Sequence, residues 1–100
     1  MPRGGPRLRT RDKKLNQVGS RVQECRQRLG LEQDAVCARL AAETEGEWNP
    51  GWQDLSRIEN GARLVSDLEI FALSLALECD ACWLLRGDGS EAPRFRTQPG

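Results

Sequence analysis

The sequence predicts a compact all-α domain of five short helices, and three observations support this class. Apolar residues recur at steps of three and four along the body, whereas no window alternates apolar and polar residues as a strand would. Glycines and capping residues separate the periodic segments by short links. The chain has 100 residues, 38% of them hydrophobic, which suits one small domain. No run of about 18 apolar residues is present, so no membrane span is expected.

The first two helices are predicted from apolar spacing. The first has an apolar face that follows steps of 4, 3 and 4 through Val18, Val22, Cys25 and Leu29. Gly30 can adopt the left-handed conformation that ends this helix. The second helix is predicted over residues 33–42, where Val36 and Leu40 lie one turn apart.

A third helix is predicted over residues 50–60. Asn49 is a good N-cap, and Pro50 suits the first helical position because its missing N–H is not needed there. Leucine, isoleucine and tryptophan supply the apolar positions of this helix, and the glycine of Asn60-Gly61 ends it.

The last two helices are predicted from their capping residues. Ser66 and Glu69 form a capping-box pattern at the start of a fourth helix, which runs to about Leu77. Asp80 is a plausible cap for a short fifth helix, and Gly87 ends it. Helices this short are not stable alone, so the prediction requires that they pack on one shared apolar core.

The charges divide the chain into three segments. Residues 1–16 carry six basic side chains against one aspartate, a net charge of +5, and are predicted to be a flexible basic arm. Residues 17–87 form the predicted domain, and up to residue 86 this body carries −5. Residues 88–100 are turn-rich and predicted to be a disordered tail. A basic arm of this kind either binds polyanions or is a solvated terminus.

Three stretches resemble the Cro/CI-type, or Xre, family of helix-turn-helix regulators: SRVQECRQRLGLEQDAV, LSRIENGARLVSDLEIFALSLAL and WLLRG. The resemblance covers about residues 19–87. It implies a λ-repressor-like domain in which the second and third helices form the helix-turn-helix and the third lies in the DNA major groove. Alignment to the family leaves about eight extra residues in the segment ETEGEWNPGW, residues 43–52. This segment is therefore identified as a lengthened turn, with Trp48 expected to tether it to the body.

The resemblance also implies which side chains meet DNA. The base-facing positions of the third helix are Trp52, Gln53, Ser56 and Arg57. Gln33 and Arg63 occupy positions that contact phosphate in relatives. For Trp52 two interpretations stay open: contact with a thymine methyl group, or packing under the loop, which is favoured because a lone helical tryptophan is more often a core residue.

Two further roles are expected from the resemblance and from helical spacing. Arg26 and Glu59 match a structural ion pair that joins the first helix to the third in phage repressors of the family. On the fourth helix, Leu68, Phe71 and Leu75 lie beside the expected inward stripe, where a monomer usually keeps polar side chains. They predict a homodimer interface, and the alternative is a monomer whose chain ends cover the patch.

The sequence argues against an enzyme and against a metal or cofactor. The chain has no histidine or tyrosine, no cysteine with an obvious base partner and no glycine-rich phosphate loop. Cys79 and Cys82 have zinc-like spacing, and Cys25 with Cys37 would complete four ligands. Because Cys25, Cys37 and Cys79 fall on packing positions, buried free thiols are predicted instead.

The function predicted from these residues is that of a sequence-specific regulator of transcription that binds double-stranded DNA, a small homodimeric repressor without a cofactor. The start of the chain lacks the apolar core of a signal peptide, so a cytoplasmic protein, associated with the nucleoid through DNA, is expected. The alternative is a protein-interaction module on the same fold, an antitoxin or an adaptor for another regulator. The −5 body favours the alternative, because DNA affinity rests largely on neutralising phosphates.

Overall fold

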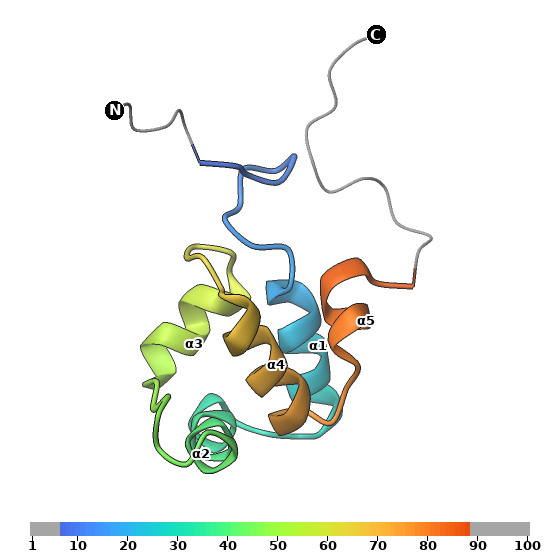
Figure 1. The fold of residues 1–100 in the computed structure, drawn as a ribbon. Helices are drawn as coiled ribbons and strands as arrows, with labels where there is room; N and C mark the ends of the chain where they lie inside the picture. Colours follow the sequence, from blue (N-terminus) through green and yellow to red (C-terminus); the bar gives the residue numbers. More distant parts are fainter. Residues whose placement is uncertain (1–6, 89–100) are drawn as a thin grey trace, which may run out of the picture.

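A computed structural model describes residues 7–88, which form five helices and no strand in that range (Figure 1). The helices are α1 (Gly19–Arg28), α2 (Gln33–Glu43), α3 (Trp52–Glu59), α4 (Asp67–Ala76) and α5 (Ala81–Arg86). α3 contacts both α1 and α2, while α4 packs against α2 and α5. The predicted all-α class with five helices is confirmed.

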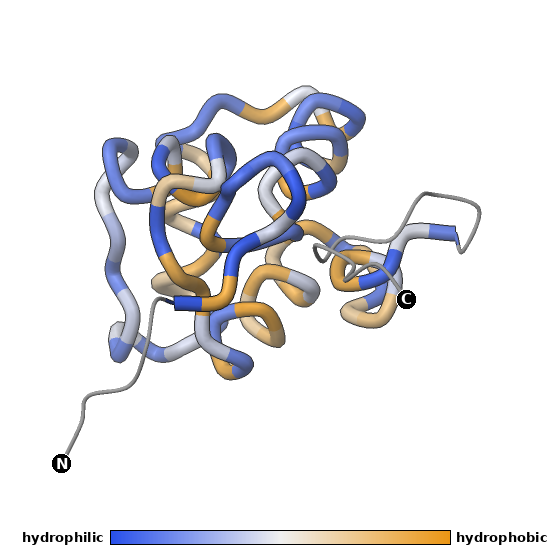
Figure 2. Tube along the Cα trace, turned by 90° about the horizontal axis from the view of Figure 1, so that it is seen from above, coloured by the Kyte–Doolittle hydropathy of each residue, from blue (hydrophilic) through white to orange (hydrophobic). Residues whose placement is uncertain are grey.

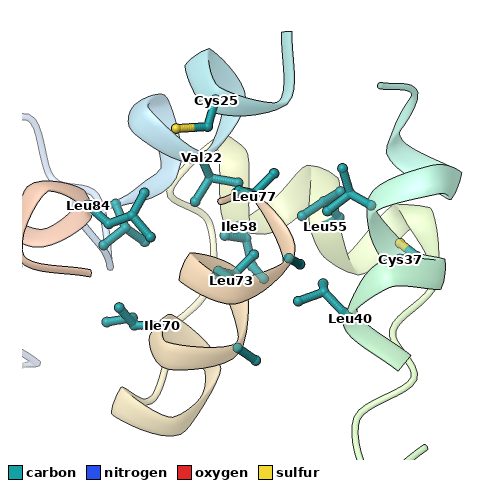
Figure 3. Packing of buried hydrophobic residues seen from close by; sticks show 14 residues of the cluster. Val22, Cys25, Cys37, Leu40, Leu55, Ile58, Ile70, Leu73, Leu77 and Leu84 are labelled. Atoms are coloured by element: carbon teal, nitrogen blue, oxygen red, sulfur yellow. The ribbon is translucent and has the colours of Figure 1, made fainter. Parts of the chain in front are cut away.

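The core lies where the apolar faces of the helices meet. Figure 3 shows side chains of α1, α2, α3, α4 and α5 pointing into one cluster. The largest fully buried side chains include Val22, Leu40, Leu55, Ile58 and Leu73. Figure 2 shows hydrophobic and hydrophilic stretches alternating along the helices, as amphipathic helices require. Each fully buried aliphatic side chain stabilises the fold by about 1.5–3 kcal/mol. Because Leu55 and Ile58 of α3 are among these side chains, their burial holds α3 against the other helices.

Most helix ends follow the predicted signals. Gly30 and Gly61 have φ angles of 71° and 73° and end α1 and α3. At the start of α4, the Ser66 hydroxyl accepts from Glu69 N and the Glu69 carboxylate accepts from Ser66 N, which completes the predicted capping box. The Asp80 carboxylate accepts from Trp83 N at the start of α5.

The start of α3 differs from the prediction. The helix begins at Trp52, so the assignment of Asn49 as N-cap and Pro50 as first residue was wrong. The backbone of Gly51 is extended, and its carbonyl accepts from Asp54 N and Leu55 N. Gly51 is therefore the N-cap, two positions after the predicted Asn49. Pro50 is buried, so packing of the loop overrides its local preference for a helix start.

The segment before α1 is joined to the body earlier than predicted. Lys14, Leu15 and Asn16, which fall within the expected flexible arm, are hydrogen-bonded to the end of α3 and the connection between α3 and α4 (Figure 1). Leu15 N donates to Gly61 O at 2.8 Å. The Asn16 amide donates to Ile58 O and Arg63 O, and its oxygen accepts from two backbone N–H groups at the start of α1. Residues 1–6 of the predicted arm and residues 89–100 of the predicted tail, which begins at residue 88, lie outside the described range.

Candidate nucleic-acid interface

The lengthened turn between α2 and α3 is tied to the body at Thr44 and Trp48. The Thr44 hydroxyl accepts from Trp48 N at 2.9 Å and donates to Leu40 O at 2.9 Å. Trp48 is half-buried and packs against the core, as expected for the residue that tethers the turn. Glu43, Glu45 and Glu47 are exposed. The lengthened turn is therefore an acidic element of the helix-turn-helix itself, tied to the body between α2 and α3.

The four predicted base-facing residues of α3 are exposed to different degrees. Gln53 and Arg57 are exposed, Ser56 is half-buried, and the opposite face of the helix is buried in the core. Trp52 is 50% exposed, so the favoured prediction that it packs under the loop was wrong. Its position as first residue of α3 keeps it at the edge of the core, where half of its surface remains available for an apolar contact.

Arg26, Gln33 and Glu59 form one polar cluster that joins α1, α2 and α3. Arg26 Nε donates to Glu59 Oε2 at 2.7 Å, and its Nη2 donates to Oε1 at 3.1 Å. Gln33 Nε2 donates to the same Oε1 at 3.1 Å. The Glu59 side chain is only 2% exposed, and its hydrogen bond raises the pKa of Arg26 above the ordinary value despite partial burial. The structure thus brings the two predicted ion-pair partners together and uses one amide hydrogen of Gln33 inside the protein.

Arg63 lies between two carboxylates. Its Nε is 3.1 Å from Asp54 Oδ1, and its Nη1 is 3.1 Å from Glu69 Oε1, with the side chain 20% exposed. The hydrogen bond to Glu69 is the main cause that raises the pKa of Arg63. A phosphate contact by Arg63, as the resemblance implies, would have to compete with both acids.

Asp54 is the residue of this surface that sequence reasoning missed. Besides Arg63, it lies 3.6 Å from Arg57 Nη1, so it balances charge at two predicted DNA-binding positions. The i, i+3 spacing from Asp54 to Arg57 is a usual signal for a helical ion pair. The contact with Arg63 has no such signal, because it depends on how the chain returns after α3.

The outer face of α4 is apolar and lies next to the lengthened turn. Leu68, Phe71 and Leu75 are 76%, 59% and 43% exposed. The expected inward stripe is buried, namely Ile70, Leu73, Ser74 and Leu77. A groove of about 440 Å³ runs between α4 and the turn, with Trp48, Phe71 and Leu75 among the residues that line it.

The cysteines have the environments of free thiols. Cys25 and Cys37 are buried, Cys79 is half-buried and Cys82 is exposed. Burial, reinforced by a hydrogen bond with Cys25, raises the pKa of Cys79 to about 12. Within residues 7–88 no three potential ligands group around a possible metal position, and no helix there is long and apolar enough to cross a membrane.

Comparisons with known proteins identify one kind of structural relative. No protein-family model matches the chain, and no curated protein sequence matches it significantly. Its structure is similar to that of the restriction-modification controller protein C.AhdI from Aeromonas hydrophila, a Cro/CI-type helix-turn-helix regulator. The TM-score is 0.58 and the identity 26%, over 70% of this chain and 94% of the controller protein.

Proposed function

We propose that the chain is a helix-turn-helix protein of the Cro/CI type that regulates transcription as a small homodimeric repressor and binds DNA sequence-specifically. One observation carries the proposal: α3 presents Trp52, Gln53 and Arg57 outward while its other face is buried in the core. The match to a restriction-modification controller protein supports the coarser statement, a DNA-binding regulator of transcription.

The exposed side chains of α3 suit base recognition in the major groove. Gln53 can bond an adenine edge and Arg57 a guanine edge, each with about 1–3 kcal/mol of discrimination against the wrong base. Trp52 offers an apolar surface to a thymine methyl group. Arg57 would exchange Asp54 for the base at small cost, because exposed ion pairs contribute only about 0–1 kcal/mol and this one is 3.6 Å long.

The polar contacts that hold α3 also support sequence-specific DNA binding. Glu59 receives hydrogen bonds from α1 and from the first residue of α2, so the three helices share one buried polar link. Bases are read only when the side chains of α3 keep a fixed register on the duplex. The Arg26–Glu59–Gln33 cluster would maintain that register.

The exposed face of α4 supports the homodimer. Leu68, Phe71 and Leu75 form a contiguous apolar patch of the kind that marks interfaces. A two-fold pair joined through α4 would present two α3 helices to successive major grooves, about 34 Å apart.

Selection of bound sequences from a random DNA pool tests the proposal directly. Enrichment of a two-fold symmetric site is expected with the wild-type chain. Gln53→Ala and Arg57→Ala should each weaken that site while leaving binding to random DNA nearly unchanged. A pool that shows no enriched sequence would contradict the proposal.

A protein-interaction module on the same fold is the second candidate. The observation that favours it is electrostatic: Asp54 balances Arg57 and Arg63, and the acidic turn stands beside α3. For such a module the same selection would return no preferred sequence, and Gln53→Ala would leave any residual DNA binding unchanged.

A further inference from the structure

A short turn before α1 carries basic side chains that form no ion pair with the other described residues. Over residues 10–14, which we call the basic turn, Thr10 N donates to Lys14 O at 2.9 Å and Lys13 N donates to Thr10 O at 2.9 Å. Arg9 Nη1 closes the same segment by donating to Lys13 O. Arg9, Arg11 and Lys13 are exposed, and no ion pair joins them to another residue of the described range.

The basic turn is held against the connection between α3 and α4. Lys14 Nζ donates to Asn60 O at 3.1 Å, and Leu15 N donates to Gly61 O. Asn16 then bonds both sides of that connection through Ile58 O and Arg63 O. Lys13 has a φ of 68°, a conformation that persists only where the surroundings fix it. Lys14 therefore anchors the basic turn next to the C-terminal end of α3.

Most arginines of the helices and of the connection between α3 and α4 differ from the cations of the basic turn, because they lie beside acidic side chains. Five of them lie within 4 Å of a carboxylate: Arg26, Arg28, Arg39, Arg57 and Arg63. Attraction to phosphate depends on uncompensated positive charge. Such charge is concentrated in the basic turn and the residue before it, where Arg9, Arg11, Lys13 and Lys14 stand against Asp12.

We propose that the basic turn binds the DNA backbone beside α3 and makes the phosphate contact that the family resemblance assigns to Arg63. The inference rests on the proposed DNA-binding function and adds the residues that hold the backbone. Arg11 and Lys13 donate to phosphate oxygens, while Lys14 and Asn16 hold the turn in place. Because the turn is docked, it contacts one fixed stretch of backbone near the end of α3.

The charge test uses Arg11→Ala combined with Lys13→Ala, both exposed positions whose side chains form no hydrogen bond or ion pair within residues 7–88. Each phosphate contact contributes about 0.9 to the slope of log affinity against log salt, so the double variant should flatten the slope by about two units. Specific and random DNA should be affected alike, because backbone contacts carry no sequence information. Arg86→Ala on α5 removes one exposed cation elsewhere and should keep the wild-type slope.

The geometry test uses Gly61→Asn. Asparagine tolerates the φ of 73° at this position, but its Cβ would come within 2.5 Å of Lys14 Cδ and 2.8 Å of Lys14 Cβ, so the turn must move. The cations remain on the chain and lose their position. We expect the slope to fall as in the charge variant, with the helical signal by circular dichroism unchanged.

The outcomes separate this inference from the function on which it rests. Wild-type binding with the same slope in the charge variant would overturn the phosphate contact alone. A flatter slope in the charge variant with a wild-type slope in Gly61→Asn would overturn the docked position, since a loose polycation would then suffice. A wild-type chain that binds no DNA would overturn both proposals.

Discussion

At the scale of single residues, Glu59 has the most demanding environment of the predicted site. Its carboxylate is almost fully buried and accepts three hydrogen bonds, two from Arg26 and one from Gln33. A buried carboxylate is tolerated only while its partners remain. The residue therefore ties the orientation of α3 to the integrity of the cluster.

We predict that Arg26→Ala destabilises the fold by about 3–5 kcal/mol, because it leaves the Glu59 charge buried without its partner. Urea unfolding followed by circular dichroism measures the change. Glu24→Ala is the matched control: it removes the exposed Arg28–Glu24 pair, which contributes at most about 1 kcal/mol. Similar losses in the two variants would show that burial of the pair is unimportant.

Glu69 predicts a pH dependence of stability. Burial alone would raise its pKa, but hydrogen bonds from Arg63 and Ser66 outweigh this effect, so the folded-state pKa lies below its ordinary value. A depressed carboxyl pKa stabilises the fold above the ordinary value, about 4.3, and this contribution is lost as the pH falls through the folded pKa. Glu69→Gln should remove that part of the acid sensitivity in urea unfolding between pH 7 and pH 3. Parallel pH profiles for the two proteins would contradict this assignment.

Residue-level prediction succeeded where a contact is local or follows from helix periodicity. The family resemblance implied the outward placement of Gln53 and Arg57, and the burial of Leu55 and Ile58 on the other face of α3 agrees with it. The position of Arg63 between Asp54 and Glu69 did not follow from the sequence, because it depends on how the chain turns after α3. The docking of residues 14–16 could not be predicted either, because it too depends on the course of the chain after α3.

At the scale of elements, the helix ends with explicit signals were predictable and the start of α3 was not. Gly30, Gly61 and the Ser66 capping box act through local backbone geometry, which the sequence specifies. The lengthened turn is shaped instead by the Thr44–Trp48 hydrogen bond and by packing of the indole. These contacts determine where the loop ends, so α3 begins at Trp52 and not at the predicted Pro50.

For α4 we predict that Phe71→Glu combined with Leu75→Lys leaves the helical signal intact and yields a monomer. Both side chains point away from the core, so the charged replacements disfavour only the association of two copies. Sedimentation measures the state, and binding to a two-half-site operator should weaken far more than binding to a half-site. Leu64→Lys changes an equally exposed leucine outside α4 and should sediment like the wild type. A wild-type chain that stays monomeric at every accessible concentration, on DNA as well as alone, would contradict the dimer.

At the scale of the whole molecule, the fold class and the helix order were predictable from the sequence. The net charge of each segment was predictable too, but the pairing of individual charges on the surface was not. Apolar periodicity specifies which faces meet, which is why the core formed as expected. The division into a basic beginning and an acidic body was also visible in the sequence. The structure was needed to show which cations lack an ion pair. Arg57 and Arg63 lie near Asp54, whereas Arg11 and Lys13 form no ion pair within residues 7–88.

The acidic turn provides the test of whether this charge distribution limits DNA binding. Changing Glu43, Glu45 and Glu47 together to glutamine raises the charge of residues 17–86 from −5 to −2. All three side chains are exposed, so folding should persist, and affinity for random DNA at low salt should rise modestly because repulsion of phosphate is reduced. Filter-binding titrations at several salt concentrations measure the change.

The matched control makes the same change in net charge outside the lengthened turn, with Glu24→Gln, Asp67→Asn and Glu78→Gln combined. An equal gain in the control would mean that net charge matters and the position of the turn does not. A loss of affinity in the turn variant would mean that the glutamates contact a partner or the bases. The turn would then be part of the recognition surface, and the acidic element beside α3 would favour a protein partner over DNA.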